Sequence, residues 1–242
     1  MIEIINLTKE FGGHSVLRGV NLTIRDGETM VIIGRSGTGK SVLLKHIIGL
    51  LRPDEGQVIV DGDEVSRADD AALRRIRMKF GMLFQGAALF DSMTVGENVA
   101  FGLREHTDMQ EAAIQDRIRE CLGYVGLSGI EHLKPAELSG GMRKRVGLAR
   151  ALAIKPGVIL YDEPTTGVDP IGSDAINKLI NSLHDKLKVT GIVVTHDMVS
   201  AFKIADRIAM LHEGRILQVG TVNEIRSSPN KTVQQFITGN SE

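Results

Sequence analysis

The sequence predicts an α/β fold in which short buried strands alternate with helices. Three apolar runs, at 30–33, 158–161 and 191–195, resemble strands, and the last two have the length and Val/Ile content of buried parallel strands. A helical pattern at 172–186 separates the last two runs, as a crossover connection would. The glycine-rich segment 34–41, GRSGTGKS, follows the first run and precedes a helical pattern at 42–51. These observations place a loop of special composition between a strand and a helix.

Composition bounds the class of protein. The 242 residues, 42% of them hydrophobic, can fill the core of one large α/β domain. A formal net charge of −1 provides no basic field, so nucleic acid is not expected as a partner. The single cysteine, Cys121, excludes an internal disulfide and is expected to be buried and inert. No apolar run spans a bilayer, and Glu3 argues against a signal peptide, so a cytoplasmic protein is expected.

The first third of the chain is expected to form a small, partly antiparallel layer of strands joined by turns. The expected strands are 2–7, 20–24, 30–33 and 57–60. A helix is expected at 66–78, followed by a strand at 80–84 that ends at Gln85.

The remainder is predicted to contain a helical subdomain and a second part of the core. Helical spacing from 86 to about 156, with a cap at Thr107 or Asp108, predicts the subdomain. Strands at 207–211 and 216–219 flank a hairpin turn, and Thr221 with Glu224 forms a capping box for a closing helix. The expected division is therefore one domain with parts 1–85, 86–156 and 157–242.

The segment GRSGTGKS has the residues of a phosphate-binding loop. Gly34, Gly37 and Gly39 allow the backbone N–H groups to turn inward around an anion. Lys40 adds a positive charge for the β and γ phosphates, and Ser41 offers a hydroxyl to Mg²⁺. A helix that starts here directs its positive dipole end at the ligand. The alternative, a glycine-rich turn of no function, does not explain the lysine and the hydroxyl together.

Two acids follow a buried strand in VILYDE, at 158–163. Ligands collect at the carboxyl ends of strands in open parallel sheets. Asp162 is expected to hold Mg²⁺, while Glu163 accepts a proton from the water that attacks the γ phosphate. Solvation of a strand end is the alternative for this segment taken alone.

Three further side chains are candidates for nucleotide contacts. His196 follows another buried strand and is expected to reach the γ phosphate or the attacking water, although a surface histidine is the simpler alternative. Gln85 supplies a neutral amide for Mg²⁺ or water, with solvation as its alternative. Phe11 either stacks on adenine or packs in the core.

The segment LSGGM, 138–142, places Ser139 and two glycines, Gly140 and Gly141, directly before a helical run at 143–152. This arrangement is a second anion-binding helix start. One chain that holds one nucleotide has little use for two such sites.

The motifs GRSGTGKS, Gln85, LSGGM, VILYDEP and His196, in this order and separation, resemble the ATP-binding subunit of an ABC transporter over nearly the whole chain. The resemblance implies a P-loop NTPase of the ABC ATPase type: a RecA-like β/α core with an antiparallel β subdomain and a helical subdomain. It implies ATP hydrolysis with Mg²⁺ held by Ser41, Gln85 and Asp162. Catalysis would depend on Glu163, His196 and Lys40.

The resemblance also implies the residues that contact the nucleotide. In the same chain these are Phe11, Val16, Gly34, Arg35, Ser36, Gly37, Thr38, Gly39, Lys40, Ser41, Val42, Gln85 and, in the D-loop, Asp169. Two subunits of this family pair head to tail, so Ser139, Gly140 and Gly141 would close over the ATP of the partner subunit. Met142 replaces the usual glutamine of LSGGQ, and Phe11 replaces the more frequent tyrosine.

LSGGM and the segment 82–106 are similar to the Mla branch of this family, the ATPases of MCE-associated lipid transporters. The implied cargo is phospholipid or a related lipid. The implied partners are a homodimer mate, an integral membrane permease, an MCE-domain protein and a STAS-domain subunit, with the ATPase peripheral on the inner membrane. The alternatives are an ABC ATPase of another importer or exporter and a non-transport ATPase of the cell-division type. A GTPase is disfavoured, because Asn177-Lys178 and Asn230-Lys231 lack the aspartate of a guanine-reading motif.

Overall fold

The computed structural model describes residues 1–239, which divide into two compact units. The first unit comprises Met1–Arg77 and the segment from Thr190 onward, and the second comprises Met78–Val189. Among the described residues, no helix combines the length and the apolar character needed to cross a membrane.

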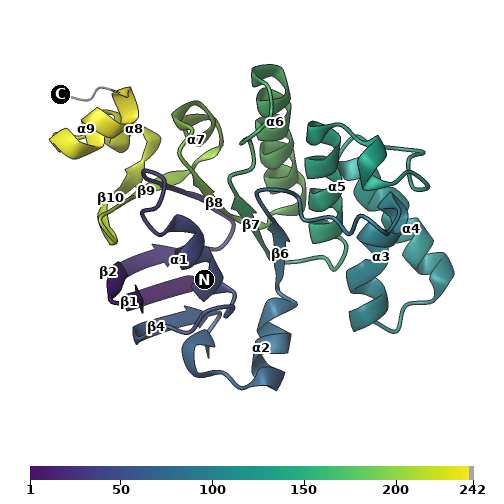
Figure 1. Cartoon of the computed structure of the whole chain (residues 1–242), viewed down its shortest axis with the longest axis horizontal. Helices are drawn as coiled ribbons and strands as arrows, with labels where there is room; N and C mark the ends of the chain where they lie inside the picture. The colour runs from purple at the N-terminus through teal and green to yellow at the C-terminus, as the bar shows by residue number, and fades with distance from the viewer. Residues whose placement is uncertain (240–242) are drawn as a thin grey trace. The chain divides into compact units, whose positions relative to one another are not determined.

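An antiparallel layer forms one part of the first unit (Figure 1). Its strand order is β2 (His14–Ile24), β1 (Ile2–Phe11), β4 (Glu55–Val60) and β5 (Asp63–Glu64). β1 and β2 are longer than the expected strands at 2–7 and 20–24, because they continue into a hairpin that turns at Gly12 and Gly13. Both glycines have positive φ, 54° and 82°, as two-residue hairpins of this hand require.

A mostly parallel sheet forms the other part of the first unit. Its strands lie in the order β10 (Arg215–Thr221), β9 (Arg207–His212), β3 (Thr29–Ile33) and β8 (Thr190–Thr195). β3 pairs in parallel with β8 and β9, so the strand at 30–33 was wrongly expected in the layer with 2–7, 20–24 and 57–60. β10 is antiparallel to β9, which confirms the expected hairpin. Every residue of β3 and β8 is buried, which explains their continuous apolar composition.

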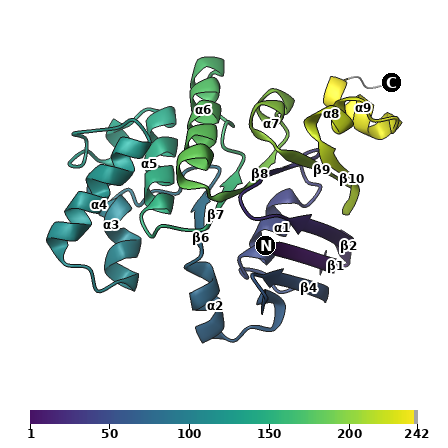
Figure 2. The ribbon, with the colours of Figure 1, turned by 180° about the vertical axis from the view of Figure 1, so that it is seen from behind.

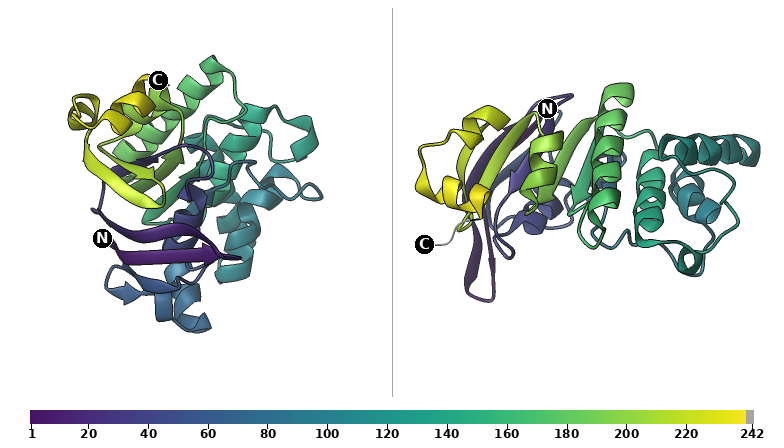
Figure 3. Two further views of the ribbon diagram at one scale, coloured as in Figure 1. Left: turned by 60° about the vertical axis from the view of Figure 1, so that its left-hand side comes forward. Right: turned by 90° about the horizontal axis from the view of Figure 1, so that it is seen from above.

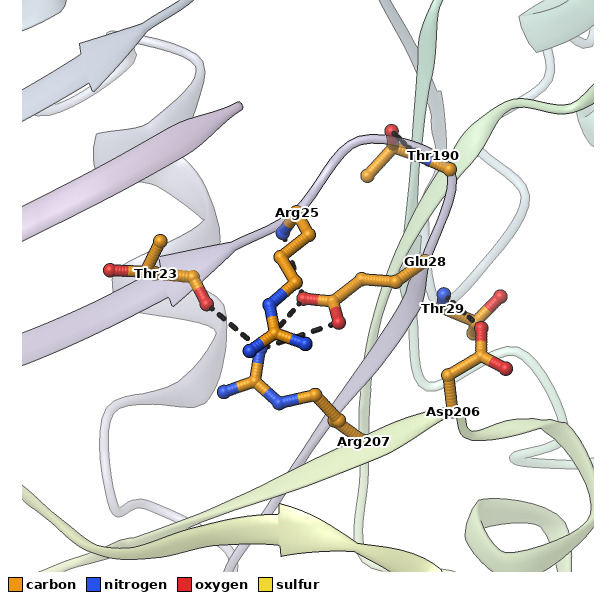
Figure 4. Close-up of polar contacts among 8 residues, drawn as sticks. Thr23, Arg25, Glu28, Thr29, Thr190, Asp206 and Arg207 are labelled. Carbon is orange, nitrogen blue, oxygen red and sulfur yellow. Dashed lines mark hydrogen bonds and ion pairs between the residues drawn. The ribbon is translucent and has the colours of Figure 1, made fainter.

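A polar cluster joins the turn before β3 to its neighbouring strands (Figure 4). The Arg207 guanidinium lies 3.1 Å from a carboxylate oxygen of Glu28, whose carboxylate also accepts a hydrogen bond from the Arg25 N–H. The Asp206 carboxylate accepts from the Thr29 N–H at 2.7 Å. Because both acids bind main-chain donors, the cluster fixes the point at which the chain enters β3.

The helices of the first unit are α1 (Lys40–Ile47), α2 (Asp70–Arg77), α7 (Met198–Ile204), α8 (Val222–Arg226) and α9 (Lys231–Thr238). α8 lies against β9 and β10 and beside α9 (Figure 3), and it begins with the expected capping box of Thr221 and Glu224. The helix expected at 66–78 is wrong at its start. Ser66 lies in a short 3₁₀ turn, η1 (Val65–Arg67), where its hydroxyl accepts a hydrogen bond from the Val58 N–H.

The second unit contains two parallel strands, β6 (Phe80–Leu83) and β7 (Val158–Asp162). Its helices are α3 (Val95–His106), α4 (Glu111–Tyr124), α5 (Gly140–Leu152) and α6 (Pro170–Leu187), with a 3₁₀ turn η2 (Pro135–Glu137). α5 packs against β6, α3 and α4, and Figure 2 shows the three helices gathered together. Cys121 in α4 is buried as expected, and burial raises the pKa of its thiol to about 11.

The expected cap at Thr107 or Asp108 is wrong. Thr107 ends α3 and donates its hydroxyl hydrogen to the Leu103 carbonyl, while α4 begins after Gln110 without a side-chain cap. The capping box lies instead at the start of α3, where Thr94 and Glu97 each bind the other's N–H. This box has the Thr-x-x-Glu spacing, so the sequence alone could have predicted it.

Asn98, fully buried in α3, holds the loop that precedes the helix. Its side chain accepts from the Phe90 N–H at 2.8 Å and donates to the Phe90, Met93 and Thr94 carbonyls. The loop thus obtains through one amide the hydrogen bonds that regular structure would otherwise provide.

Asn98→Ala should lower the free energy of unfolding by about 1–3 kcal/mol, because it leaves a buried donor and several carbonyls without this partner. Denaturant unfolding of the full chain measures the change. Asn223→Ala, at an exposed position of α8, serves as the control and should change it by less than about 0.5 kcal/mol. Equal effects of the two substitutions would contradict the role given to Asn98.

Candidate functional site

The glycine-rich loop lies at the carboxyl edge of the sheet in the first unit. β3 ends at Ile33, which is in register with Thr195 of β8 and Met210 of β9. The loop therefore follows the central strand of three parallel strands, where an open α/β sheet binds its ligands. α1 begins at Lys40, so its N-terminal dipole end faces the loop.

Lys40 is the charged centre of this loop. Its side chain is only 6% exposed, and its ammonium donates to the carbonyls of Gly34 at 2.8 Å and Arg35 at 3.1 Å. Because these bonds lie within the loop, the cation is held where an anion bound by the loop would meet it.

Two glycines of the loop are required by close neighbours. A Cβ at Gly34 would lie 2.3 Å from the Leu211 carbonyl oxygen at the end of β9. Gly39 has φ +99°, and a Cβ there would lie 2.9 Å from the Leu17 side chain. The loop thus passes between β9 and β2 at distances that only glycine permits.

A cavity of about 450 Å³ opens beside the loop in the first unit. Its walls come from the loop, from β2 and from the β9–β10 turn: His14, Ser15, Val16, Arg18, Arg35, Ser36, Gly37, Thr38, His212, Glu213 and Gly214. The Arg18 N–H donates to the Gly214 carbonyl at 2.8 Å, which joins β2 to the turn. The sequence argument did not identify this turn as a wall of the cavity.

Phe11 lies at the end of β1 and is 43% exposed, so it does not pack in the core. The Lys9 ammonium lies 5.4 Å from the centre of its ring. Phe11 is paired across the hairpin with His14, which lines the cavity, although Phe11 itself is not one of the lining residues. Its stacking on adenine stays a prediction.

His196 follows β8 directly and is exposed. Because Ile33 and Thr195 are in register, His196 and Gly34 leave neighbouring strands at the same edge. Asp197 caps α7 by accepting from the Val199 and Ser200 N–H groups, which fixes the chain just beyond the histidine.

The predicted acids and Gln85 share a sheet edge in the second unit. Leu83 of β6 is in register with Tyr161 of β7, so Gln85 lies just beyond one strand and Asp162 ends the neighbouring parallel strand. The strand expected at 80–84 ends one residue earlier, and Gln85 is exposed. Glu163 is 8% exposed with φ +49°, and its carboxylate accepts from the Thr166 hydroxyl at 3.2 Å.

The segment LSGGM at 138–142, here called the signature segment, and the D-loop at 167–169 line one cavity of about 400 Å³ in the second unit. Ser139 caps α5 by accepting from the Met142 N–H at 3.3 Å, as expected. Asp169 caps α6 by accepting from the Ile171 and Gly172 N–H groups. The cavity is lined by Ser139, Gly140, Gly141, Met142, Arg145, Gly167, Val168, Asp169, Gly172 and Ile176. It combines a helix N-terminus with exposed glycine backbone, which suits an anion.

The proposed magnesium ligands are an alcohol, an amide and a carboxylate. Ser41, Gln85 and Asp162 offer oxygen donors only, which suits a hard cation that retains water and binds phosphate. Residues 1–239 contain no cluster of three or more His, Cys, Asp or Glu side chains that forms a metal cage. The oxygen donors of the three proposed ligands fit Mg²⁺ that is bound together with a nucleotide phosphate.

The sequence argument also missed Lys144. This α5 side chain is 6% exposed and donates to the Glu163 and Pro164 carbonyls at 3.1 and 2.8 Å. Its position in a basic helical run resembles a solvated face, and no spacing rule identifies its partners.

Comparison with known proteins gives the family. The sequence model of the ABC transporter family matches residues 17–166. The chain is 40% identical to the intermembrane phospholipid transport system ATP-binding protein MlaF of Haemophilus influenzae, over all of this chain and 92% of that protein. It is 44% identical to the probable ribonucleotide transport ATP-binding protein mkl of Mycobacterium tuberculosis, over 98% of this chain but only 66% of that protein's length.

A solved structure agrees with these sequence matches. A dimeric ATP-binding cassette in a post-hydrolysis state, bound to ADP and Pi, superposes with a TM-score of 0.84 at 36% identity. The match covers 92% of this chain and 99% of the cassette. The chain therefore belongs to the ABC transporter family and has the α/β P-loop NTPase fold of its ATPase cassettes.

Proposed function

We propose that this chain is the ATP-hydrolysing subunit of an ABC transporter that moves phospholipid or a related lipid. The main structural support for ATP hydrolysis is the set of polar residues at the carboxyl ends of parallel strands. The phosphate loop and His196 share an edge in one unit, and Gln85, Asp162 and Glu163 share an edge in the other. The lipid cargo is supported by the near full-length similarity to MlaF.

The proposed roles follow from the chemistry of each side chain. Lys40 and the loop N–H groups bind the phosphates, and Phe11 and Val16 contact the base and sugar. Mg²⁺, when bound by Ser41, Gln85 and Asp162, neutralises phosphate charge. Glu163 accepts the proton of the attacking water, and His196 orients that water or the γ phosphate.

Two copies of the chain are proposed to act together. Ser139, Gly140 and Gly141 form an anion-binding helix start in the second unit, away from the phosphate loop in sequence. In a head-to-tail dimer they would bind the γ phosphate held by the partner, with Asp169 of the D-loop nearby. The dimeric state of the similar cassette supports this arrangement.

The proposed membrane partners are an integral permease, an MCE-domain protein and a STAS-domain subunit, with the ATPase peripheral on the cytoplasmic face. The segment 86–156 is proposed as the helical subdomain that contacts the permease. Phe90 and Phe101 are 42% and 37% exposed, with ring centres 4.8 Å apart. Phe101 and Met93 line a cavity of about 220 Å³ together with the charged residues Glu97, Arg104 and Glu105, so it offers both apolar and polar contacts to a partner.

The names of other relatives indicate a different cargo for those proteins. The mkl name gives ribonucleotide as cargo, and a 44% identical protein of Caulobacter vibrioides is named for sulfate/thiosulfate import. Identification of the proteins and lipids that remain with the chain after gentle detergent extraction tests the cargo. Phospholipid with a permease supports lipid transport, whereas a soluble partner without lipid contradicts it.

Lys40→Ala should raise the Kd of ATP about 10- to 100-fold, since a hydrogen bond to a charged group contributes about 1.5–3 kcal/mol. Calorimetric titration with ATP and Mg²⁺ measures the change. Lys45→Ala removes the same charge from an exposed position of α1 and should bind ATP normally. Unchanged affinity in Lys40→Ala would exclude the loop as the phosphate site.

Glu163→Gln should slow ATP hydrolysis by about 10²–10⁴-fold while ATP binding is retained, because a general base contributes about that factor. Phosphate release under saturating ATP measures the rate. Glu55→Gln, at an exposed position of β4, is the matched control. Hydrolysis at the parent rate in Glu163→Gln would show that another group accepts the proton.

Phe101→Ser should weaken assembly with the permease without changing ATP affinity. Removal of an aromatic anchor costs about 2 kcal/mol, which corresponds to roughly thirtyfold in Kd. Binding of the purified chain to permease in detergent measures the loss, with Leu50→Ser, half exposed in the first unit, as control. If only Leu50→Ser weakens assembly, the docking surface lies on the first unit.

A further inference from the structure

The strongest unexplained feature is a buried cation next to the proposed catalytic base. Lys144 lies in α5, and its ammonium donates to the Glu163 carbonyl at 3.1 Å and the Pro164 carbonyl at 2.8 Å. Burial lowers the pKa of this ammonium, and the nearby Glu163 charge opposes the shift. Desolvation of an ammonium is costly unless it is well paired. An apolar residue would fill the position at lower cost, so the cation indicates a specific role.

The loop that Lys144 binds needs such support. Glu163 has φ +49°, a left-handed conformation that is uncommon for a residue with a Cβ. The Glu163 carbonyl also accepts from the Thr166 N–H at 3.2 Å, and the Glu163 carboxylate accepts from the Thr166 hydroxyl. The backbone conformation at 163 sets the direction of the carboxylate, so the contacts that hold this turn also aim the base.

The helix that carries Lys144 begins at the signature segment. Ser139 caps α5, and Lys144 lies little more than one turn later. One rigid helix thus connects the proposed binding site for the partner's ATP with the loop of the chain's own catalytic base.

A second cation of α5 acts in the same way. Arg150 donates to the carbonyls of Ala87 and Ala88 at 2.8 and 2.6 Å, and both alanines have positive φ. These residues follow Gln85 after one intervening glycine, Gly86. Cations of α5 therefore bind two segments with left-handed backbone, one after β6 and one after β7.

We infer that Lys144 is a positioning residue for Glu163: its ammonium fixes the loop of the catalytic base to the signature helix, so that binding of the partner's ATP at Ser139–Gly141 and aiming of this chain's own carboxylate are linked. The inference rests on the proposed role of Glu163 as base. No bond is made or broken by Lys144.

Lys144→Met tests the inference, because it removes the charge and keeps an unbranched side chain of similar length. We expect kcat for ATP hydrolysis to fall about 10- to 100-fold, the cost of a small misplacement of a catalytic group. The KM and Kd of ATP should stay at the parent values. Lys144→Arg should restore most of the turnover, since a guanidinium can also donate to both carbonyls. Lys178→Met, an exposed lysine of α6 paired with Asp174, is the control and should leave turnover unchanged.

A double-mutant cycle separates positioning from general stability. If Lys144 acts through Glu163, adding Lys144→Met to Glu163→Gln should slow the residual hydrolysis no further. Should Lys144→Met fail to fold, as judged by circular dichroism, Lys144→Leu gives the same comparison, because it also removes the charge and cannot donate to either carbonyl.

The outcomes are distinct. Parent turnover in Lys144→Met, or equal slowing in both backgrounds, overturns the inference while Glu163 keeps its role. A loss of ATP affinity that accounts for the whole effect also overturns it. Parent turnover in Glu163→Gln refutes the proposed base itself, before Lys144 is considered.

Discussion

Cations bonded to pairs of main-chain carbonyls hold the loops and helix ends of this protein. Each cation donates to carbonyl oxygens of a loop or a helix end. Lys40, Arg117 and Lys144 do so from buried positions. The donors and their acceptor pairs are Lys40 with Gly34 and Arg35, Arg77 with Ile48 and Gly49, Arg117 with Leu152 and Ala153, Lys144 with Glu163 and Pro164, and Arg150 with Ala87 and Ala88.

These contacts divide into two kinds. Arg77 and Arg117 bind the carbonyls at the C-terminal ends of α1 and α5, where the helix dipole favours a cation. Lys40, Lys144 and Arg150 bind loops that follow parallel strands, which are the segments that carry the proposed nucleotide contacts. The first kind of contact stabilises the C-terminal ends of helices. The second kind binds loops, two of which hold residues with a Cβ in the left-handed region, namely Glu163 and the pair Ala87 and Ala88.

The sequence predicted those features for which a local pattern corresponds to one structure. The strand–glycine loop–helix context located Lys40, the Thr221 and Glu224 spacing located a capping box, and one cysteine in a helical pattern was correctly placed in the core. The apolar runs also predicted that Gln85, Asp162 and His196 lie at strand ends. Once the strands of a parallel sheet are known, their carboxyl ends define one edge of the sheet.

The features that the sequence did not predict depend on contacts between segments distant in the chain. The cap expected at Thr107 failed because its hydroxyl binds the preceding turn, Leu103, instead of the following helix. The helix expected from Ser66 starts late because that hydroxyl is used by Val58 of β4. Lys144 looked like one more residue of a basic helical run, since its partners lie near position 163 and no helical or strand period connects them.

The positions of these cations suggest how the two ATP sites of the proposed head-to-tail dimer could be coupled. In the proposed dimer, α5 would start at the partner's phosphate. Its cations are bonded to the carbonyls of residues 163–164 and 87–88, so a shift of the helix would move both loops together. Side-chain acceptors would absorb a small shift by rotating about their χ angles, whereas carbonyls displace the backbone itself. The proposed coupling through α5 would therefore require no conformational change inside the helix, only a change in its position when Ser139, Gly140 and Gly141 contact phosphate.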